Sequence, residues 1–133
     1  MPCFTGPCNG GLTPVAQWVT RFGMSSLFET LRAGFSDPAA PAIIEGGGRE
    51  HSYAELLARS GGIAQALASR GLRAGDRIVV QTGKSVHALL LYLAAVRSGI
   101  VYVPLNPGYT RAELDYFLGD ADPALFVDDE VLR

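Results

Sequence analysis

Residue types that hold a phosphate occur in the segment Thr82-Gly83-Lys84-Ser85. In a P-loop, backbone N–H groups and a lysine bind phosphate oxygens, and the loop joins a strand to a helix. This segment does stand between a β-branched run and a helical pattern, but the motif G-x-x-x-x-G-K-[ST] also requires a glycine at position 78, where the chain has Ile78. We therefore predict that the loop does not wrap a phosphate and that Lys84 is an exposed residue at a helix start.

The histidines and the acidic run have few neighbours of the kind that catalysis or metal binding needs. His51 and His87 lie far apart, with no H-x-x-x-H or His-Cys pairing, so we expect each to be a surface or partly buried imidazole and not a ligand or base. The sequence holds no G-x-S-x-G or G-x-G-x-x-G motif. For Asp128, Asp129 and Glu130 we expect a solvated run instead of a metal site.

The two cysteines and three of the tyrosines have regular spacings, but neither group predicts a functional site. Cys3 and Cys8 have C-x₄-C spacing, but without a second pair or a nearby histidine a zinc site would lack two ligands. Tyr102, Tyr109 and Tyr116 recur every seven residues but fall on a predicted strand, loop and helix, so they share no face. We expect the ring of Tyr109 to pack and its hydroxyl to reach water.

The elements that would position these residues are indicated by caps, periodicity and glycines. Capping boxes, in which a hydroxyl and a glutamate satisfy backbone N–H groups, are predicted at residues 26–29, 52–55 and 110–113. The helices they open run to about Ala33, to near Arg70 and to the turn at 120–123, and a further helix opens at Ser85 and closes at Gly99. A hairpin is predicted at residues 42–45 and 49–52, with strands at 77–81, 100–103 and 124–127.

Residues 77–127 therefore follow a β-α-β-α-β order, and their apolar strands predict a parallel sheet covered on both faces. The fold class is α/β, a partial doubly wound sheet preceded by a short helix, a hairpin and a helix. In such sheets ligands bind where the carboxyl ends of strands meet helix N-termini. That geometry nominates the loops at residues 82–85 and 105–110.

Composition limits the function classes. The chain has 133 residues, of which 48% are hydrophobic, and a net charge of −2 with no long basic run, which argues against nucleic acid or an anionic membrane as a partner. The unbroken apolar stretch at residues 88–96 is far shorter than the ~20 residues that a membrane-spanning helix needs. Residues 1–23 do not resemble a secretory signal. We expect a cytoplasmic protein with a disordered extension at 1–23, or a start at Met24, and one domain part at 24–133.

Three stretches, in this order and spacing, resemble the N-terminal region of the adenylate-forming acyl-activating superfamily, or AMP-dependent synthetases and ligases. They are G-x-x-x-G-D at residues 71–76, R-x-G-x-V-Y-V-P-L-N-P at 97–107 and E-L-x-Y-x-L-x-D-x-x-P at 113–123. The resemblance covers residues 27–128. Within the superfamily, this stretch looks like malonyl-CoA synthetase-like acyl-CoA ligases. It implies a fragment of a larger domain.

That resemblance implies a reaction in which a carboxylate attacks ATP, with Mg²⁺ on the phosphates, and coenzyme A then displaces AMP to give a thioester. The phosphate loop and catalytic lysine of the superfamily correspond to nothing in this chain, so we predict no catalytic, cofactor-binding or metal residue here. ATP, Mg²⁺, coenzyme A and a carboxylic acid such as malonate are implied for the full-length enzyme only.

Two positions bear on coenzyme A. Some acyl-CoA ligases have an arginine after the Asn-Pro pair, near the coenzyme A phosphate, whereas this chain has Gly108. Arg97 is the nearest alternative cation, and we prefer to interpret it as a charge favoured at a helix C-terminus. Two hypotheses follow: an N-terminal fragment of an acyl-CoA synthetase, inactive alone, or a free-standing small α/β binding or interaction module.

Overall fold

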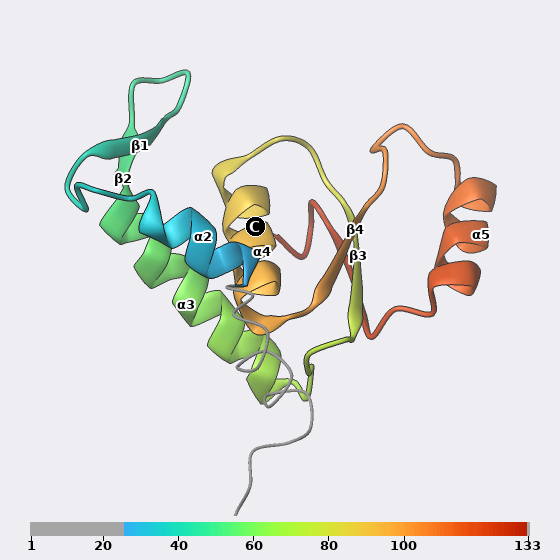
Figure 1. Cartoon of the computed structure of the whole chain (residues 1–133). Helices are drawn as coiled ribbons and strands as arrows, with labels where there is room; N and C mark the ends of the chain where they lie inside the picture. The colour runs from blue at the N-terminus through green and yellow to red at the C-terminus, as the bar shows by residue number, and fades with distance from the viewer. Residues whose placement is uncertain (1–25, 133) are drawn as a thin grey trace, which may run out of the picture.

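A computed structural model of the protein describes residues 26–132. The extension predicted for residues 1–23, the alternative start at Met24, and Cys3 and Cys8 lie outside these residues. The elements, in chain order, are α2 (Leu27–Ala33), β1 (Pro41–Ile44), β2 (Glu50–Ser52), α3 (Tyr53–Ser69), β3 (Arg77–Gln81), α4 (Val86–Ser98), β4 (Val101–Pro104), α5 (Arg111–Ala121) and β5 (Leu125–Asp128) (Figure 1).

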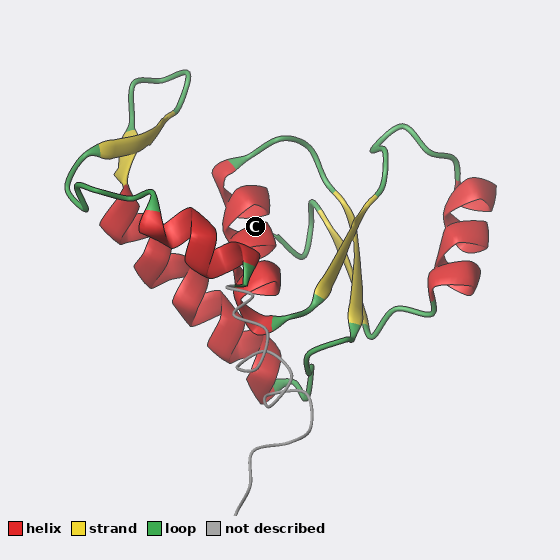
Figure 2. Cartoon of the chain, viewed as in Figure 1, coloured by secondary structure: helices red, strands yellow, loops and turns green. Residues whose placement is uncertain are grey.

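The strands form two sheets (Figure 2). β1 and β2 pair antiparallel as a hairpin, and β3 lies at the centre of a parallel sheet of order β4-β3-β5. Helices α2, α3 and α4 lie on one side of this sheet and α5 lies on the other (Figure 1). The predicted α/β class, the β-α-β-α-β order along the chain and the parallel pairing are confirmed.

The helix starts show why the capping pattern is a good predictor and where it fails. Hydroxyls of Ser26, Ser52, Ser85 and Thr110 each accept a hydrogen bond from a backbone N–H three residues on. Only at Thr110 does a glutamate complete the reciprocal box, and its bonds to Thr110 lower the pKa of Glu113. The other two predicted boxes are half formed, because the Glu29 carboxylate pairs with Arg32 and that of Glu55 with His51.

One helix end differs slightly from the prediction and another matches it. α5 continues through Ala121 and ends at Asp122, which has a positive φ of 43°, so the predicted turn at 120–123 begins two residues late. α4 ends where predicted, at Gly99 with φ 69°; its backbone N–H bonds the Val96 carbonyl, and left-handed backbone of this kind favours glycine.

The core lies between the sheet and the α3/α4 pair. Ile78 and Val80 of β3 point to this side, and α4 is buried along five of its residues. A second cluster, centred on Leu56, Leu90 and Leu93, joins α3 and α4 to the hairpin. These two clusters bury the apolar stripes that predicted the helices.

The opposite face of the sheet is covered less completely. Side chains alternate along a strand, so Val79, Val101 and Val103 share the face toward α5. Val79 is buried, but Val101 is 47% exposed, and no residue of α5 is buried within the part of the chain that the structure describes. The expected helix is therefore present on both faces, but only the α4 face is closed. Across residues 26–132, no helix is long and apolar enough to cross a membrane.

Candidate functional site

The carboxyl ends of the three parallel strands bring three loops to one edge of the sheet. The chain leaves β3 toward α4 on one face and returns to β5 from α5 on the other (Figure 1), so the strand order reverses between β3 and β5. Ligands of doubly wound sheets bind at such a point. A hollow of about 440 Å³ lies there, lined by Gln81, Pro107, Asp128, Asp129 and Glu130. We call this the switch-point hollow.

The end of β3, directly before the first loop nominated from the sequence, contacts the second nominated loop. The Gln81 side-chain amide donates hydrogen bonds to the backbone carbonyls of Asn106 at 3.1 Å and of Tyr109 at 3.5 Å. Within the second loop, the Gly108 N–H donates to the Asn106 side chain at 2.9 Å. Gln81 therefore ties the end of β3 to residues 105–110.

The third loop at this edge was missed from the sequence. The Asp129 carboxylate accepts the Gly83 N–H at 3.2 and 3.4 Å, and the Asp128 carboxylate accepts the N–H groups of Glu130 and Val131 at 3.0 and 2.9 Å. Asp129 and Glu130 are exposed, as expected of a solvated run, but two of the three carboxylates also bind backbone. Gly83 and Asp129 are 46 residues apart, so no local pattern could reveal their contact.

The edge of the sheet near residues 82–85 is acidic in the described part of the chain. The Gly83 N–H, which a P-loop would direct at a phosphate, is bound to a carboxylate, and the neighbouring acidic groups repel an anion. Lys84 is exposed and lines a different hollow beside the hairpin, as the missing glycine at position 78 predicted. In residues 26–132, no group of three His, Cys, Asp or Glu side chains is placed to hold a metal ion.

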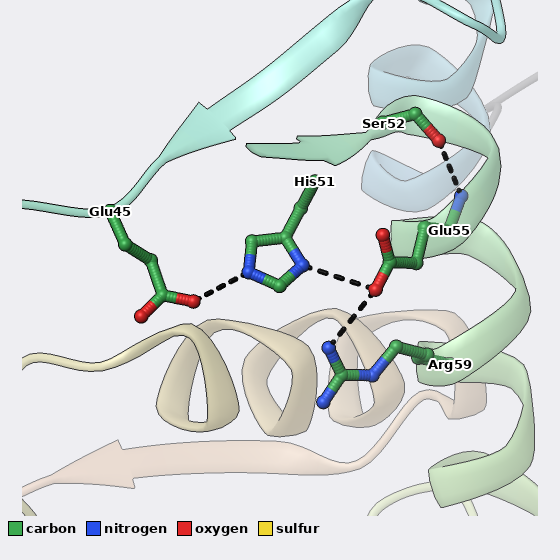
Figure 3. Close-up of polar contacts among 5 residues, drawn as sticks. All are labelled: Glu45, His51, Ser52, Glu55 and Arg59. Atoms are coloured by element: carbon green, nitrogen blue, oxygen red, sulfur yellow. Dashed lines mark hydrogen bonds and ion pairs between the residues drawn. The ribbon is translucent and has the colours of Figure 1, made fainter. Parts of the chain in front are cut away.

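A second cluster of ionisable groups joins the hairpin to α3 (Figure 3). The ring of His51, on β2, lies between Glu45, which follows β1, and Glu55, in the first turn of α3. Its Nε2 is 2.6 Å from Glu45 Oε1 and its Nδ1 is 3.1 Å from Glu55 Oε1. Arg59 Nη1 lies 3.4 Å from the same oxygen of Glu55. We call Glu45, His51 and Glu55 the histidine bridge.

The expectation of a surface or partly buried ring is correct for His87, which is exposed, and wrong for His51, which is 1% exposed. Two carboxylates compensate the burial of His51 by hydrogen-bonding both ring nitrogens, because a buried ring must have its polar atoms hydrogen-bonded. The bonds to Glu45 and then Glu55 raise the pKa of His51, and the bond to His51 lowers the pKa of each glutamate. With both ring nitrogens occupied, His51 is not available as a base for a substrate.

Arg97 proves to be a packing residue at the junction of three helices. Its Nη1 donates to the Leu57 carbonyl at 2.9 Å and contacts the Ser60 hydroxyl at 3.2 Å, and its guanidinium lies 4.7 Å from the centre of the Phe28 ring. A Cβ on Gly61 would come within 3.1 Å of the same guanidinium nitrogen. Arg97 therefore joins α4 to α2 and α3 at the end away from the switch-point hollow, beyond the helix C-terminal role that we expected.

The three tyrosines lie on a strand, a loop and a helix, as predicted. The Tyr109 ring stacks on Phe117 of α5 with centroids 5.1 Å apart, which confirms the packing expected of it. Tyr102 meets Tyr92 edge-on at 5.4 Å, and partial burial raises its pKa. The rings of Tyr102 and Tyr109 therefore hold α4 and α5 to the sheet and its loops, whereas Tyr116 is 68% exposed and its ring meets Phe117 of its own helix.

Comparison with known proteins agrees with this architecture. The AMP-binding enzyme family matches residues 32–132. MatB from Rhodopseudomonas palustris, a structure also determined with ATP bound, superposes with a TM-score of 0.73 and 52% identity, covering 76% of this chain and 20% of MatB. Acyl-CoA ligase SID4 of Ajellomyces capsulatus is 33% identical over 81% of the chain and 18% of its own length. The probable non-canonical nonribosomal peptide synthetase CymA of Salinispora arenicola is 36% identical over 80% of the chain and 1% of its own length.

The fold and its switch point define an α/β domain part of the adenylate-forming type. The chain belongs to the AMP-binding enzyme family. It spans at most about a fifth of the length of these three relatives.

Proposed function

We propose that this chain serves as the N-terminal part of an AMP-forming acyl-CoA ligase. In the whole enzyme a carboxylic acid attacks ATP, Mg²⁺ stabilises the phosphate charge, and the thiol of coenzyme A displaces AMP to give a thioester. The observation that carries the proposal is the family match over residues 32–132, together with 52% identity to MatB. The resemblance to malonyl-CoA synthetase-like ligases makes malonate the acid of first choice.

We further propose that the chain does not catalyse either step alone. Asp129 occupies the Gly83 N–H at the edge of the sheet where a nucleotide would bind, and the acidic residues beside it disfavour phosphate. An apolar groove of about 480 Å³, with Ile63, Leu67 and Leu125 in its walls, lies between α3, α4 and β5. Exposed apolar grooves beside an edge strand are typical of surfaces that another segment covers.

The direct experiment is carboxylate-dependent exchange of pyrophosphate into ATP by the purified 133-residue chain, with malonate and with acetate. We expect exchange no faster than without protein. Exchange that depends on malonate and disappears with Ile78→Asp, which places a charge in β3, would show that the chain is active alone.

A chimera tests the part the chain would play in a ligase. These residues replace the matching fifth of MatB, and we expect malonate-dependent exchange to return, unlike in MatB without that segment. Lys84→Met in the chimera should leave exchange intact, because Lys84 is exposed and outside any phosphate cradle. A folded chimera without exchange would contradict the proposed function, and loss of exchange on Lys84→Met would contradict our interpretation of residues 82–85.

The alternative is a free-standing α/β binding or interaction module, and the two buried clusters of the α4 face are the observation that favours it. It predicts a sharp, cooperative unfolding transition with sheet amides protected from exchange, including those of β5. A ligase fragment should instead melt broadly or aggregate through the groove and the edge of β5.

A further inference from the structure

We propose that the histidine bridge is a proton-dependent clamp that holds the tip of the β1–β2 hairpin on α3 and beside the start of α4. It joins the hairpin turn through Glu45, β2 through His51 and, directly after β2 in the chain, the first turn of α3 through Glu55 (Figure 3). The His51 side chain is 2% exposed, whereas those of Glu45 and Glu55 are 42% and 37% exposed. The centre of the clamp is therefore dry and its two arms reach water.

The number of protons follows from the geometry. An ionised carboxylate only accepts hydrogen bonds, and each ring nitrogen of His51 faces one carboxylate oxygen. Both nitrogens must then carry a hydrogen, which makes the ring an imidazolium cation between two anions. Loss of one proton leaves a lone pair on one nitrogen facing a carboxylate oxygen, so that contact turns from attractive to repulsive.

Other charged groups around the bridge act on the arms more than on the ring. Arg59 of α3 bonds the Glu55 carboxylate, while Arg49 of the hairpin and His87 of α4 act on Glu45 through space. All three are basic and hold the glutamates ionised, which favours the proton on His51.

The hairpin has a second attachment at its base, so the clamp controls its tip. The Tyr53 and Ala54 N–H groups donate to the carbonyls of Ala40 and Pro38 at 3.2 and 2.9 Å, and Ile43 packs on the cluster of Leu56, Leu90 and Leu93. The tip also forms one wall of a hollow of about 490 Å³, whose other wall is the start of α4 at residues 84–87 and 89. Release of Glu45 therefore changes the wall of that hollow without detaching the hairpin.

The pH range over which the clamp contributes to stability follows from the direction of each pKa shift. The raised pKa of His51 gives a contribution that is complete below its ordinary value of 6.5 and is lost as the pH rises through the folded-state value. The lowered pKa values of Glu45 and Glu55 give contributions present above 4.5 and lost as the pH falls through their folded-state values. The contribution of the clamp is thus complete between about pH 4.5 and 6.5, and the clamp opens on the alkaline side as the pH rises through the raised pKa of His51.

The first measurement is NMR titration of the imidazole nitrogens of His51 in the unmodified chain. We expect both nitrogens of His51 to be protonated at pH 6 and the ring to titrate above 6.5. Over the same pH range, protection of the Glu45 and Gly48 amides, which close the hairpin turn, should fall several-fold beyond the intrinsic pH effect.

Glu45→Gln and Glu50→Gln form a matched pair. Both remove one carboxylate from the hairpin, but of the two only the Glu45 carboxylate bonds the His51 ring. Glu45→Gln should lower the pKa of His51 and move the loss of protection to lower pH, while Glu50→Gln leaves both unchanged. A His51 ring that titrates at or below 6.5, a response to Glu50→Gln equal to that of Glu45→Gln, or hairpin protection indifferent to the titration would each overturn the clamp.

Discussion

The two faces of the parallel sheet differ in how completely this chain covers them. α4 buries five residues against β3 and α3, whereas α5 buries none within residues 26–132. α5 is held at its ends, by the capping box at Thr110 and by the Arg77 guanidinium, which bonds the carbonyls of Ala121 and Asp122. The stability of the chain therefore resides on the α4 face, and the α5 face relies on polar contacts and on stacked rings.

Truncation of a buried side chain should give the largest difference in stability loss between the two faces. Leu90→Ala removes a side chain that is 1% exposed in the cluster joining α3, α4 and the hairpin, and we expect it to lower the free energy of unfolding by about 2–5 kcal/mol. Leu114→Ala, at a half-buried position of α5, should cost less than half as much. Chemical denaturation followed by circular dichroism measures both losses. Equal losses would mean that the two faces contribute equally to the free energy of unfolding.

Arg97→Met tests the junction that closes the α4 face. It keeps most of the side-chain volume but removes the bond to the Leu57 carbonyl and the charge over the Phe28 ring, and we expect a loss of about 1–2 kcal/mol. Arg73→Met is the control, because Arg73 is an exposed loop residue whose backbone N–H, not its side chain, donates to Asp76. A loss no larger than that of the control would show that the contacts of Arg97 contribute nothing.

Thr110→Ala should have the smallest global effect and a clear local one. The capping box satisfies N–H groups at the start of α5, and its loss costs about 1 kcal/mol of helix stability. Hydrogen exchange should quicken in α5 and remain unchanged in α4, while Thr110→Ser retains protection. Faster exchange in both helices would show that α5 is coupled to the α4 face after all.

Local signals were sufficient wherever neighbouring residues decide the structure. Ser85 and Gly99 bracket α4 as predicted, because an N-terminal hydroxyl and a left-handed glycine act within one turn of the helix. The parallel sheet followed from the alternation of apolar strands and helices, and the family followed from three motifs in order.

The contacts that needed the folded chain all join residues from different elements. Glu55 was expected to complete a helix cap, but its carboxylate binds the ring of His51 four residues earlier, because packing buries that ring and a buried ring must have its polar atoms hydrogen-bonded. Likewise Asp129 reaches Gly83 only after β5 has crossed to the far side of β3.

The amino-acid sequence by itself therefore determined the helices, the strands and the family, since periodicity and caps are local and the motifs are linear. Only the tertiary structure decided the partners of Glu55, His51 and Asp129, which lie in other segments of the chain. Whether a carboxylate caps a helix, ties a loop or shares a proton with a buried ring depends on which partner lies within about 3 Å, and that distance is set by packing.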